Sequence, residues 1–329
     1  MMKRVSKILT LCIMLVAMMT QTVSHFTVHA KETLNVAIVQ LVSHPSLDDI
    51  VEGVKKGLAD AGYKEGDNLS VDFYNAEGDM NLLSSIAETV VNKKPDVIYA
   101  VTTPVAQFMA DATSEIPIIL AGITDPVGAK LVDSLEKPGG NITGVSDKVS
   151  YEQQFELLKE LQPDVKTVGM LYTTNEDSSL AELKEAAEVA KKFGIEAKIE
   201  GIDSTLDMQL VAENLAGKVD AIFVGSDNTI ASAFETLLDA TDAAKIPIFS
   251  TVDTFVKQGA LSAVAINQRD IGIQAAMMGV DVFNGKHPGN MPIQHVEKLV
   301  SVINSKTAEF LSIELSDALK AKLTDVSEE

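Results

Sequence analysis

The sequence predicts an α/β protein made of two doubly wound lobes joined by a multi-strand hinge. Three observations lead to this prediction. The chain has 329 residues, more than one such lobe needs. Short apolar runs alternate with helical patterns throughout. One passage also occurs twice, led by Asp96 in the first half and by Asp220 in the second. In both copies a buried apolar strand is followed by small polar residues and then by a helical pattern.

The first half of the chain reads as alternating strands and helices. Strands are predicted at 33–40, 69–74, 95–101 and 116–121, and helices at 47–61, 82–91 and after 104. Gly62 ends the first helix, as glycine often does. A turn at 138–141 leads through 142–147 into a helix from about 151 to 161.

The second half repeats this order. Strands are predicted at 167–172, 195–199, 219–224 and 246–253, and helices at 180–193, at 208–215 and after 228. Val168 in the second half corresponds to Val36 in the first, and Gly194 corresponds to Gly62. The separation is the same in both pairs, which indicates two lobes of one topology.

The last seventy residues are too few for a third lobe. They contain a predicted strand at 261–267, a helix at 271–283, an extended segment at 291–304 and a short helix at 316–323. We expect these elements to cross back and complete both lobes. The first lobe then comprises residues 31–147 and about 267–293, and the second comprises 148–266 and about 294–329.

Residues 1–30 are typical of a signal peptide. Three bases precede an apolar stretch at 8–19, and Val28-His29-Ala30 is a small-residue cleavage pattern. We therefore expect an exported protein, with an uncleaved anchor as the alternative. The only cysteine, Cys12, lies within this segment. Because Leu11 precedes it and the apolar run continues beyond it, lipidation at Cys12 is the less favoured interpretation.

The net charge of −20 disfavours nucleic acid and anionic membrane surfaces as partners. The histidines at 44, 287 and 295 lack metal-ligand spacing, and no phosphate-binding glycine motif follows a strand. Neither Gly144-Val145-Ser146 nor Gly225-Ser226-Asp227 completes a nucleophile elbow. We expect no enzyme activity, no metal and no cofactor, and we expect a monomer.

Uncharged polar residues and a few aspartates gather where the predicted strands end. Any one of them is explained as a helix cap or turn former, but both lobes place them at equivalent edges. They are Gln40, Ser43, Thr102, Thr103, Thr124 and Asp125 in the first lobe, and Thr173, Asn175, Ser226, Asp227, Asn228, Thr251 and Asp253 in the second.

These groups suit a zwitterion such as an amino acid. Helix amino ends with hydroxyl groups favour a carboxylate. Asp125, Asp227 or Asp253, or the amide of Asn267, offers an acceptor for an ammonium group. Tyr172, at the end of a strand, is expected to face the cleft between the lobes.

Several segments resemble the bacterial ABC-transporter substrate-binding proteins of the tryptophan/tyrosine-binding type. The resemblance covers essentially the whole chain after residue 30. It rests on QLVSHP at 40–45, TTPVAQ at 102–107, TDPVGA at 124–129, PGGNITGVSD at 138–147, SDNT at 226–229 and VKQGA at 256–260.

The resemblance implies a type I periplasmic-binding-protein-like fold that closes on its ligand and delivers it to an ABC permease outside the cytoplasmic membrane. It favours an aromatic amino acid, tryptophan first. The alternatives are another small solute, a sensing module acting through a receptor, or an extracellular two-lobed enzyme. The ligand-binding residues that it implies are Gln40, Thr103, Thr124, Asp125, Ser146, Asp147, Tyr172, Ser226, Asp227, Asn228, Asp253 and Asn267.

Overall fold

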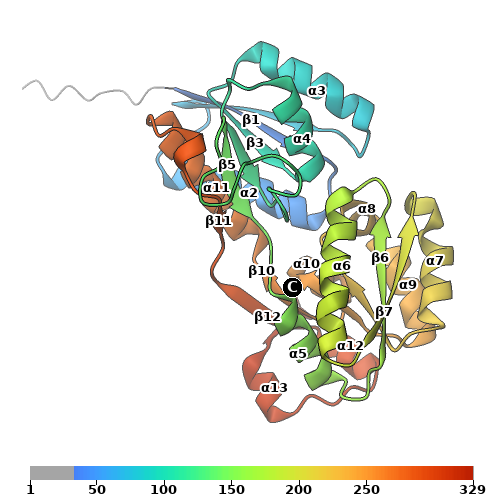
Figure 1. Ribbon diagram of the computed structural model, residues 1–329. Helices are drawn as coiled ribbons and strands as arrows, with labels where there is room; N and C mark the ends of the chain where they lie inside the picture. Colours follow the sequence, from blue (N-terminus) through green and yellow to red (C-terminus); the bar gives the residue numbers. More distant parts are fainter. Residues whose placement is uncertain (1–32, 329) are drawn as a thin grey trace, which may run out of the picture. The chain divides into compact units, whose positions relative to one another are not determined.

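Two parallel-rich β-sheets with helices packed against them make up the computed structural model (Figure 1). It describes residues 33–328, so the predicted signal peptide lies outside the described residues. Each sheet with its helices is called a lobe below. The two-lobed α/β fold predicted from the sequence is confirmed.

The first lobe is built on a six-stranded sheet in the order β11-β5-β4-β3-β1-β2, with every pair parallel. Its strands are β1 (Leu34–Gln40), β2 (Leu69–Asn75), β3 (Val97–Val101), β4 (Ile118–Ala121), β5 (Ile142–Ser146) and β11 (Gln294–His295). Its helices are α2 (Pro45–Asp60), α3 (Met80–Lys93), α4 (Thr103–Ala112), α11 (Gln268–Phe283) and the short η2 (Pro288–Asn290). β3, β4 and β5 are entirely buried, because helices cover both faces of the sheet.

The second lobe has a seven-stranded sheet in the order β13-β12-β10-β9-β8-β6-β7. Only the β10–β12 pair is antiparallel among the described strands. The strands are β6 (Thr167–Thr173), β7 (Glu196–Ile202), β8 (Ala221–Val224), β9 (Ile248–Val252), β10 (Ser262–Ile266), β12 (Leu299–Ile303) and β13 (Thr324–Asp325). The helices are α5 (Tyr151–Leu161), α6 (Asp177–Lys192), η1 (Thr205–Asp207), α7 (Met208–Ala216), α8 (Asn228–Ser232), α9 (Phe234–Ala244), α10 (Asp253–Gln258), α12 (Ser305–Phe310) and α13 (Asp317–Lys322).

The two sheets share one strand order, which is the structural counterpart of the repeat in the sequence. The first five strands of each lobe run second-first-third-fourth-fifth across the sheet. In sheets of this order, ligands bind beyond the carboxyl ends of the strands, where the order reverses. The duplicated passage supplies β3 with α4 in one lobe and β8 with α8 in the other.

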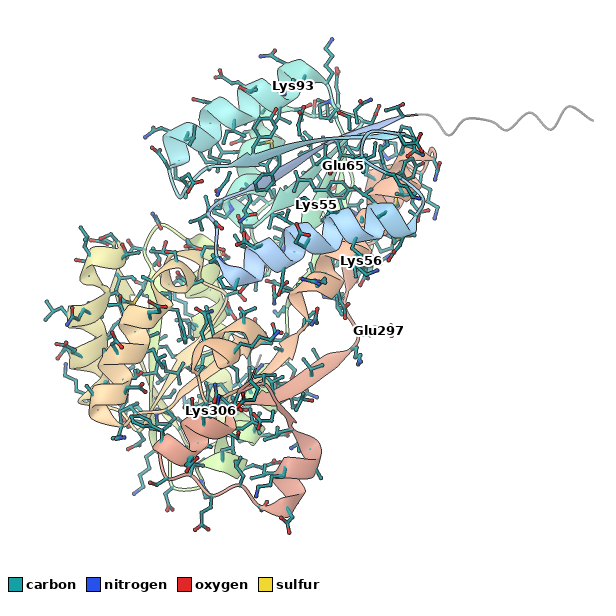
Figure 2. All side chains as sticks on the ribbon, turned by 180° about the vertical axis from the view of Figure 1, so that it is seen from behind. Lys55, Lys56, Glu65, Lys93, Glu297 and Lys306 are labelled. Atoms are coloured by element: carbon teal, nitrogen blue, oxygen red, sulfur yellow. The ribbon has the colours of Figure 1, made fainter. Side chains whose placement is uncertain are left out.

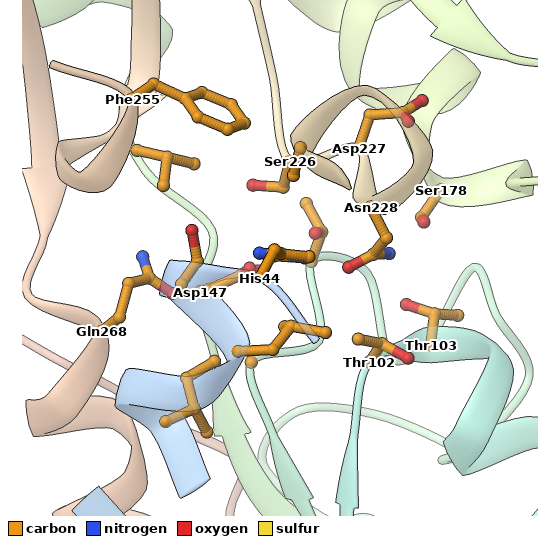
Figure 3. A pocket seen from close by; sticks show the side chains of 17 residues that line it. His44, Thr102, Thr103, Asp147, Ser178, Ser226, Asp227, Asn228, Phe255 and Gln268 are labelled. Atoms are coloured by element: carbon orange, nitrogen blue, oxygen red, sulfur yellow. The ribbon is translucent and has the colours of Figure 1, made fainter. Parts of the chain in front are cut away.

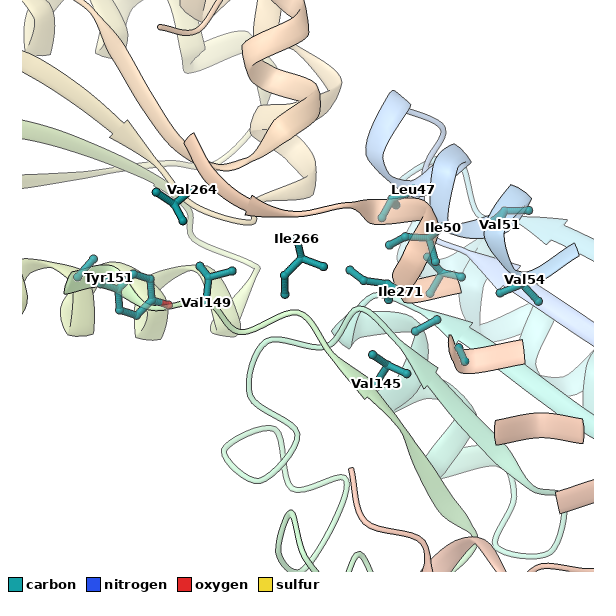
Figure 4. Close-up of a cluster of buried hydrophobic side chains, with 14 of the residues drawn as sticks. Leu47, Ile50, Val51, Val54, Val145, Val149, Tyr151, Val264, Ile266 and Ile271 are labelled. Atoms are coloured by element: carbon teal, nitrogen blue, oxygen red, sulfur yellow. The ribbon is translucent and has the colours of Figure 1, made fainter. Parts of the chain in front are cut away.

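Three segments cross between the lobes. β5 leads into α5, β10 leads into α11, and β11 leads into β12. Apolar side chains line these crossings and join the cores of both lobes, including Val145, Val149, Val264 and Ile266 (Figure 4). The amide of Gln154 bonds both backbone groups of Val264 and so ties α5 to β10.

Two close approaches in the first lobe require glycine. Gly144 in β5 has φ +146°, and an added Cβ would lie 2.3 Å from the backbone of Leu120 in β4. Gly272 in α11 lies against α2, where a Cβ would lie 2.0 Å from the carbonyl oxygen of Ile50. Helix α2 is thereby packed directly onto α11. This packing fixes the direction in which the amino end of α2 points.

The outer surface carries most of the charge. Figure 2 shows Lys55 and Lys56 on α2, Lys93 at the end of α3 and Lys306 on α12. Exposed pairs such as Lys306–Glu328, at 2.8 Å, contribute about 1 kcal/mol or less each, so the apolar cores provide most of the stability. Within residues 33–328, no helix is long and apolar enough to cross a membrane.

Several parts of the fold differ from the sequence expectation. Asp253 was expected at a strand end and instead begins α10. α12 forms where no helix was predicted, and its amino end is capped by Asn304 through the backbone N–H of Thr307, at 3.0 Å. The segment 291–304 is not continuously extended but contains β11 in one sheet and β12 in the other.

Candidate functional site

A cavity of about 470 Å³, open space at its mouth included, lies between the carboxyl ends of the two sheets (Figure 3). Residues from both lobes line it. They are His44, Ser46, Leu47, Ile50, Thr102, Thr103, Gly122, Thr124, Asp147, Ser178, Ser226, Asp227, Asn228, Ala231, Val252, Phe255 and Gln268. Of the sequence-predicted site residues, the structure therefore brings together Thr103, Thr124, Asp147, Ser226, Asp227 and Asn228.

Thr102 and Thr103 form the turn between β3 and α4. Thr102 is 4% exposed, has φ +90°, and its hydroxyl has no hydrogen-bond partner among the described residues. A β-branched residue rarely adopts positive φ, so the surrounding structure holds this turn in a strained conformation. The strain presents a buried hydroxyl and the amino end of a ten-residue helix to the cavity.

Asp147 follows β5 at the first crossing between the lobes. Its Oδ1 is enclosed and has no partner among the described residues, although the Thr124 side chain donates to the carboxylate. Burial raises the pKa of Asp147 to about 6. An enclosed carboxylate with an unused oxygen is complementary to a cationic hydrogen-bond donor.

His44 precedes α2 and is 7% exposed. Neither ring nitrogen meets hydrogen-bond geometry with any described residue. Burial lowers the pKa of His44 to about 4, against smaller opposing effects from Asn228, Asp48 and Asp227. The imidazole that faces the cavity is therefore neutral near pH 7.

Asp227 lines the cavity, but its carboxylate is occupied within the second lobe. It accepts hydrogen bonds from the backbone N–H and the hydroxyl of Thr173, from the hydroxyl of Ser179 and from the backbone N–H of Ile230, at 2.7 to 2.9 Å. These bonds join β6, α6 and the amino end of α8. Asp227 thus shapes the cavity wall, and its charge is satisfied without a ligand.

Two further buried carboxyl groups support the same wall. Glu176 accepts hydrogen bonds from backbone and side-chain groups of Asn228 and Thr229, at 2.6 to 3.1 Å. Glu182 accepts from the backbone N–H of Ser226 at 2.8 Å. Burial raises the pKa of both groups, to about 8 for Glu182. The amide nitrogen of Asn228 donates to Glu176, and the same side chain also interacts with His44.

Six predicted residues do not line this cavity, and each has contacts elsewhere. The Gln40 amide donates to Asp48 at 2.7 Å and to the carbonyl of Val42. Ser146 donates to the carbonyl of Thr124 at 3.4 Å. Asn267 caps α11 through the backbone N–H of Asp270.

The remaining three also lie outside it. Asp125 accepts from the backbone of Gly128 at 2.8 Å and lines a neighbouring hollow. The Tyr172 ring lies against Gly201, because alternation along β6 directs it to the sheet face rather than the cavity. Asp253 begins α10, with Lys257 at 3.7 Å.

The apolar part of the cavity was not predicted from the sequence. Leu47 and Ile50 come from α2, and Val252 and Phe255 from β9 and α10. Phe255 stacks on Phe234 with ring centroids 4.5 Å apart, which fixes the ring. The apolar spacing of α2 is evident in the sequence, but packing of the helix against the core accounts for it without a ligand.

A direct hydrogen bond joins the two lobes beside this apolar part of the cavity. The Ser46 hydroxyl, at the amino end of α2, lies 2.5 Å from the Thr254 hydroxyl in α10. Both residues are buried and are 208 positions apart in the sequence. Within residues 33–328, excluding the side chain of Asp177, no group of three or more His, Cys, Asp or Glu residues could hold a metal ion.

A family model described as ABC transporter substrate binding protein matches residues 35–327. The chain belongs to the ABC transporter substrate-binding protein family. The family inferred from the sequence motifs is thus confirmed. Among curated relatives of this substrate-binding protein, the tyrosine-binding protein of Clostridioides difficile (strain R20291) is 39% identical over 285 residues, which are 87% of this chain and 83% of the relative.

Two solved structures that are similar to this substrate-binding protein differ in whether a ligand is bound. The crystal structure of an ABC domain from Streptococcus pneumonia in complex with L-Trp matches with a TM-score of 0.87 and 39% identity, over 89% of this chain and 99% of that one. A ligand-free, open substrate-binding protein from Clostridium difficile matches with a TM-score of 0.71 and 34% identity, over 90% and 100%. This chain therefore superposes more closely on the complex than on the open structure.

Proposed function

We propose that this protein captures an aromatic amino acid, tryptophan first, in the cavity between its lobes. We further propose that it is exported and hands its ligand to an ABC permease at the outer side of the cytoplasmic membrane. Family membership supports the transport role. The ligand class is supported by the similarity to a tyrosine-binding protein and to a complex with L-Trp.

The observation that carries the proposal is the pairing of an anion site with an enclosed carboxylate in one cavity. At the amino end of α4 the first-turn N–H groups, apart from Pro104, have no partner within the helix. The unpartnered hydroxyl of Thr102 lies beside them. We assign the ligand's α-carboxylate to this turn and to the Thr103 hydroxyl, and its ammonium group to Asp147.

The side chain of the ligand occupies the apolar part in this proposal. Leu47, Ile50, Val252 and Phe255 offer surfaces that suit a flat ring. The neutral imidazole of His44 lies between the two parts (Figure 3). It adds a polar edge without adding a charge that would repel the ammonium group.

Binding and closure are sufficient for this function, and no covalent step is needed. The α4 turn and Asp147 belong to the first lobe and its crossing, whereas Ser226 and Phe255 belong to the second. A ligand held first by one lobe and then contacted by both favours the closed arrangement. The hydrogen bond between Ser46 and Thr254 forms only when the lobes meet, and we assign it to the closed form.

Isothermal titration calorimetry of the purified protein against the twenty amino acids tests the proposal, with myo-inositol and a nucleoside as controls. We expect heat on binding L-tryptophan or L-tyrosine and a matching rise in the thermal midpoint, because a ligand that binds only the folded state stabilises it. Binding of a control solute without binding of any amino acid would overturn the ligand class.

A further inference from the structure

We propose that Gln268 selects ligands whose ring carries a hydrogen-bond donor, and so favours tryptophan and tyrosine over phenylalanine. The inference rests on the proposed function, because it assumes an aromatic amino acid in the cavity. It adds a residue and a chemical rule for the choice among such amino acids.

Both the backbone and the side chain of Gln268 are held in place. It is the first residue of α11, directly after Asn267, whose side chain caps the helix through Asp270. Gln268 is 6% exposed and lines the cavity. Its amide nitrogen donates to the backbone carbonyl of Ile266 at 3.3 Å. The amide oxygen has no such bond within residues 33–328, so it remains as an acceptor.

The position of this acceptor fits the ring rather than the carboxylate of the ligand. Figure 3 shows Gln268 and Phe255 on one side of the cavity and Thr102 and Thr103 on the opposite side. With the carboxylate at the α4 turn, the ring extends toward Phe255 and Ile50. In the proposed pose the indole N–H or the phenol O–H is the ring group that meets the Gln268 amide oxygen.

A ring without a donor leaves this acceptor buried and unpaired. Phenylalanine would remove the acceptor from water without replacing its hydrogen bond, and such a loss costs much more than the missing atom itself. We expect L-tryptophan and L-tyrosine to bind at least about tenfold more tightly than L-phenylalanine. The discrimination follows from the amide oxygen and not from the volume of the cavity.

Calorimetry with four ligands separates the donor from ring size. The probes are L-tryptophan, L-tyrosine, L-phenylalanine and 3-benzothienyl-L-alanine, which replaces the indole N–H by sulfur and keeps the ring shape. The wild-type protein should bind 3-benzothienyl-L-alanine about tenfold more weakly than L-tryptophan. Equal affinity for these two ligands would overturn the inference, and this comparison needs no variant.

Two substitutions on α11 locate the effect. Gln268→Met keeps a similar length and removes the amide oxygen, so the preference for L-tryptophan over 3-benzothienyl-L-alanine should fall to about twofold or less. Gln274→Met is the matched control, because Gln274 does not line the cavity. Its amide nitrogen donates to the Gln294 amide oxygen at 2.6 Å. This control should keep the wild-type preference.

The outcomes distinguish this inference from the proposed function. If Gln268→Met weakened the binding of L-tryptophan and of 3-benzothienyl-L-alanine equally, Gln268 would contact the amino-acid head group. The selection rule would then be wrong, and the proposed binding of amino acids would be unaffected. If the wild-type protein bound none of the four ligands, the proposed function itself would fail.

Discussion

Replacing Asp147 by asparagine should stabilise the unliganded protein and weaken ligand binding. The pKa of Asp147 rises from 3.8 to about 6 because the carboxylate is enclosed. Ionised Asp147 therefore costs the folded state at most about 3 kcal/mol at pH 7. Asp147 is partly exposed to the cavity, which lowers the expected gain from Asp147→Asn to about 1–3 kcal/mol.

The pH dependence of this gain has a fixed sign. The cost appears as pH rises from about 4 to above 6, because the unfolded chain ionises at the lower pH and the folded protein at the higher. The stability of Asp147→Asn should therefore equal that of wild type near pH 4 and exceed it at pH 7. At pH 7 the thermal midpoint should rise by about 2–6 °C.

Ligand binding should change in the opposite direction. Asparagine cannot balance an ammonium charge, so the affinity for L-tryptophan should fall at least about tenfold. Paired thermal melts and calorimetry measure both effects on one preparation. Asp125→Asn is the control, because Asp125 is exposed, accepts from Gly128 and lies outside the cavity. A less stable Asp147→Asn variant with unchanged affinity would refute the assignment.

Three further predictions follow from the same contacts. The affinity for L-tryptophan should fall about tenfold between pH 7 and pH 5 as Asp147 is protonated, and calorimetry of Asp147→Asn should show no such change. Asp227→Ala should lower the free energy of unfolding in urea by about 3 kcal/mol or more, since four buried hydrogen bonds are lost; a loss under about 1 kcal/mol would contradict the structural role. Ser46→Ala should weaken ligand binding about fivefold by removing the bond to Thr254, with unchanged stability, whereas the exposed Ser85→Ala should bind as wild type.

The sequence was sufficient to predict the fold because its central strands, such as β3, β4, β8 and β9, are buried on both faces. Such strands give short apolar runs that are easy to locate, and their nearly constant offsets between the halves exposed the repeat. The short helices were harder. α10 begins at Asp253, immediately after β9, and six residues leave little periodicity from which to recognise a helix.

The residues of the cavity were predictable only where the backbone alone sets their position. Thr103, Ser226 and Asn228 lie between the ends of β3 and β8 and the first residues of the helices that follow, so the topology places them at the cavity. Tyr172 also ends a strand, but its direction depends on the alternation of side chains along β6. A shift of one position along a strand reverses the face, and no sequence signal fixed this.

Residues that reach the cavity from helices were missed. Phe255 and Gln268 lie on the first turns of α10 and α11, where direction depends on helix orientation. Glu176 and Glu182 were hidden by the acidity of the whole chain, since 47 acidic residues make any two of them unremarkable. The sequence around His44 carries only the absence of metal-ligand spacing, and the burial of His44 beside the cavity is visible only in three dimensions.

A crystal structure of the protein with bound L-tryptophan tests the central claim most directly. We expect the ligand between the lobes, with its carboxylate at the Thr102–Thr103 turn, its ammonium group on Asp147 and its indole N–H on the oxygen of Gln268. A ligand bound in the reverse orientation, or outside this cavity, would contradict the account.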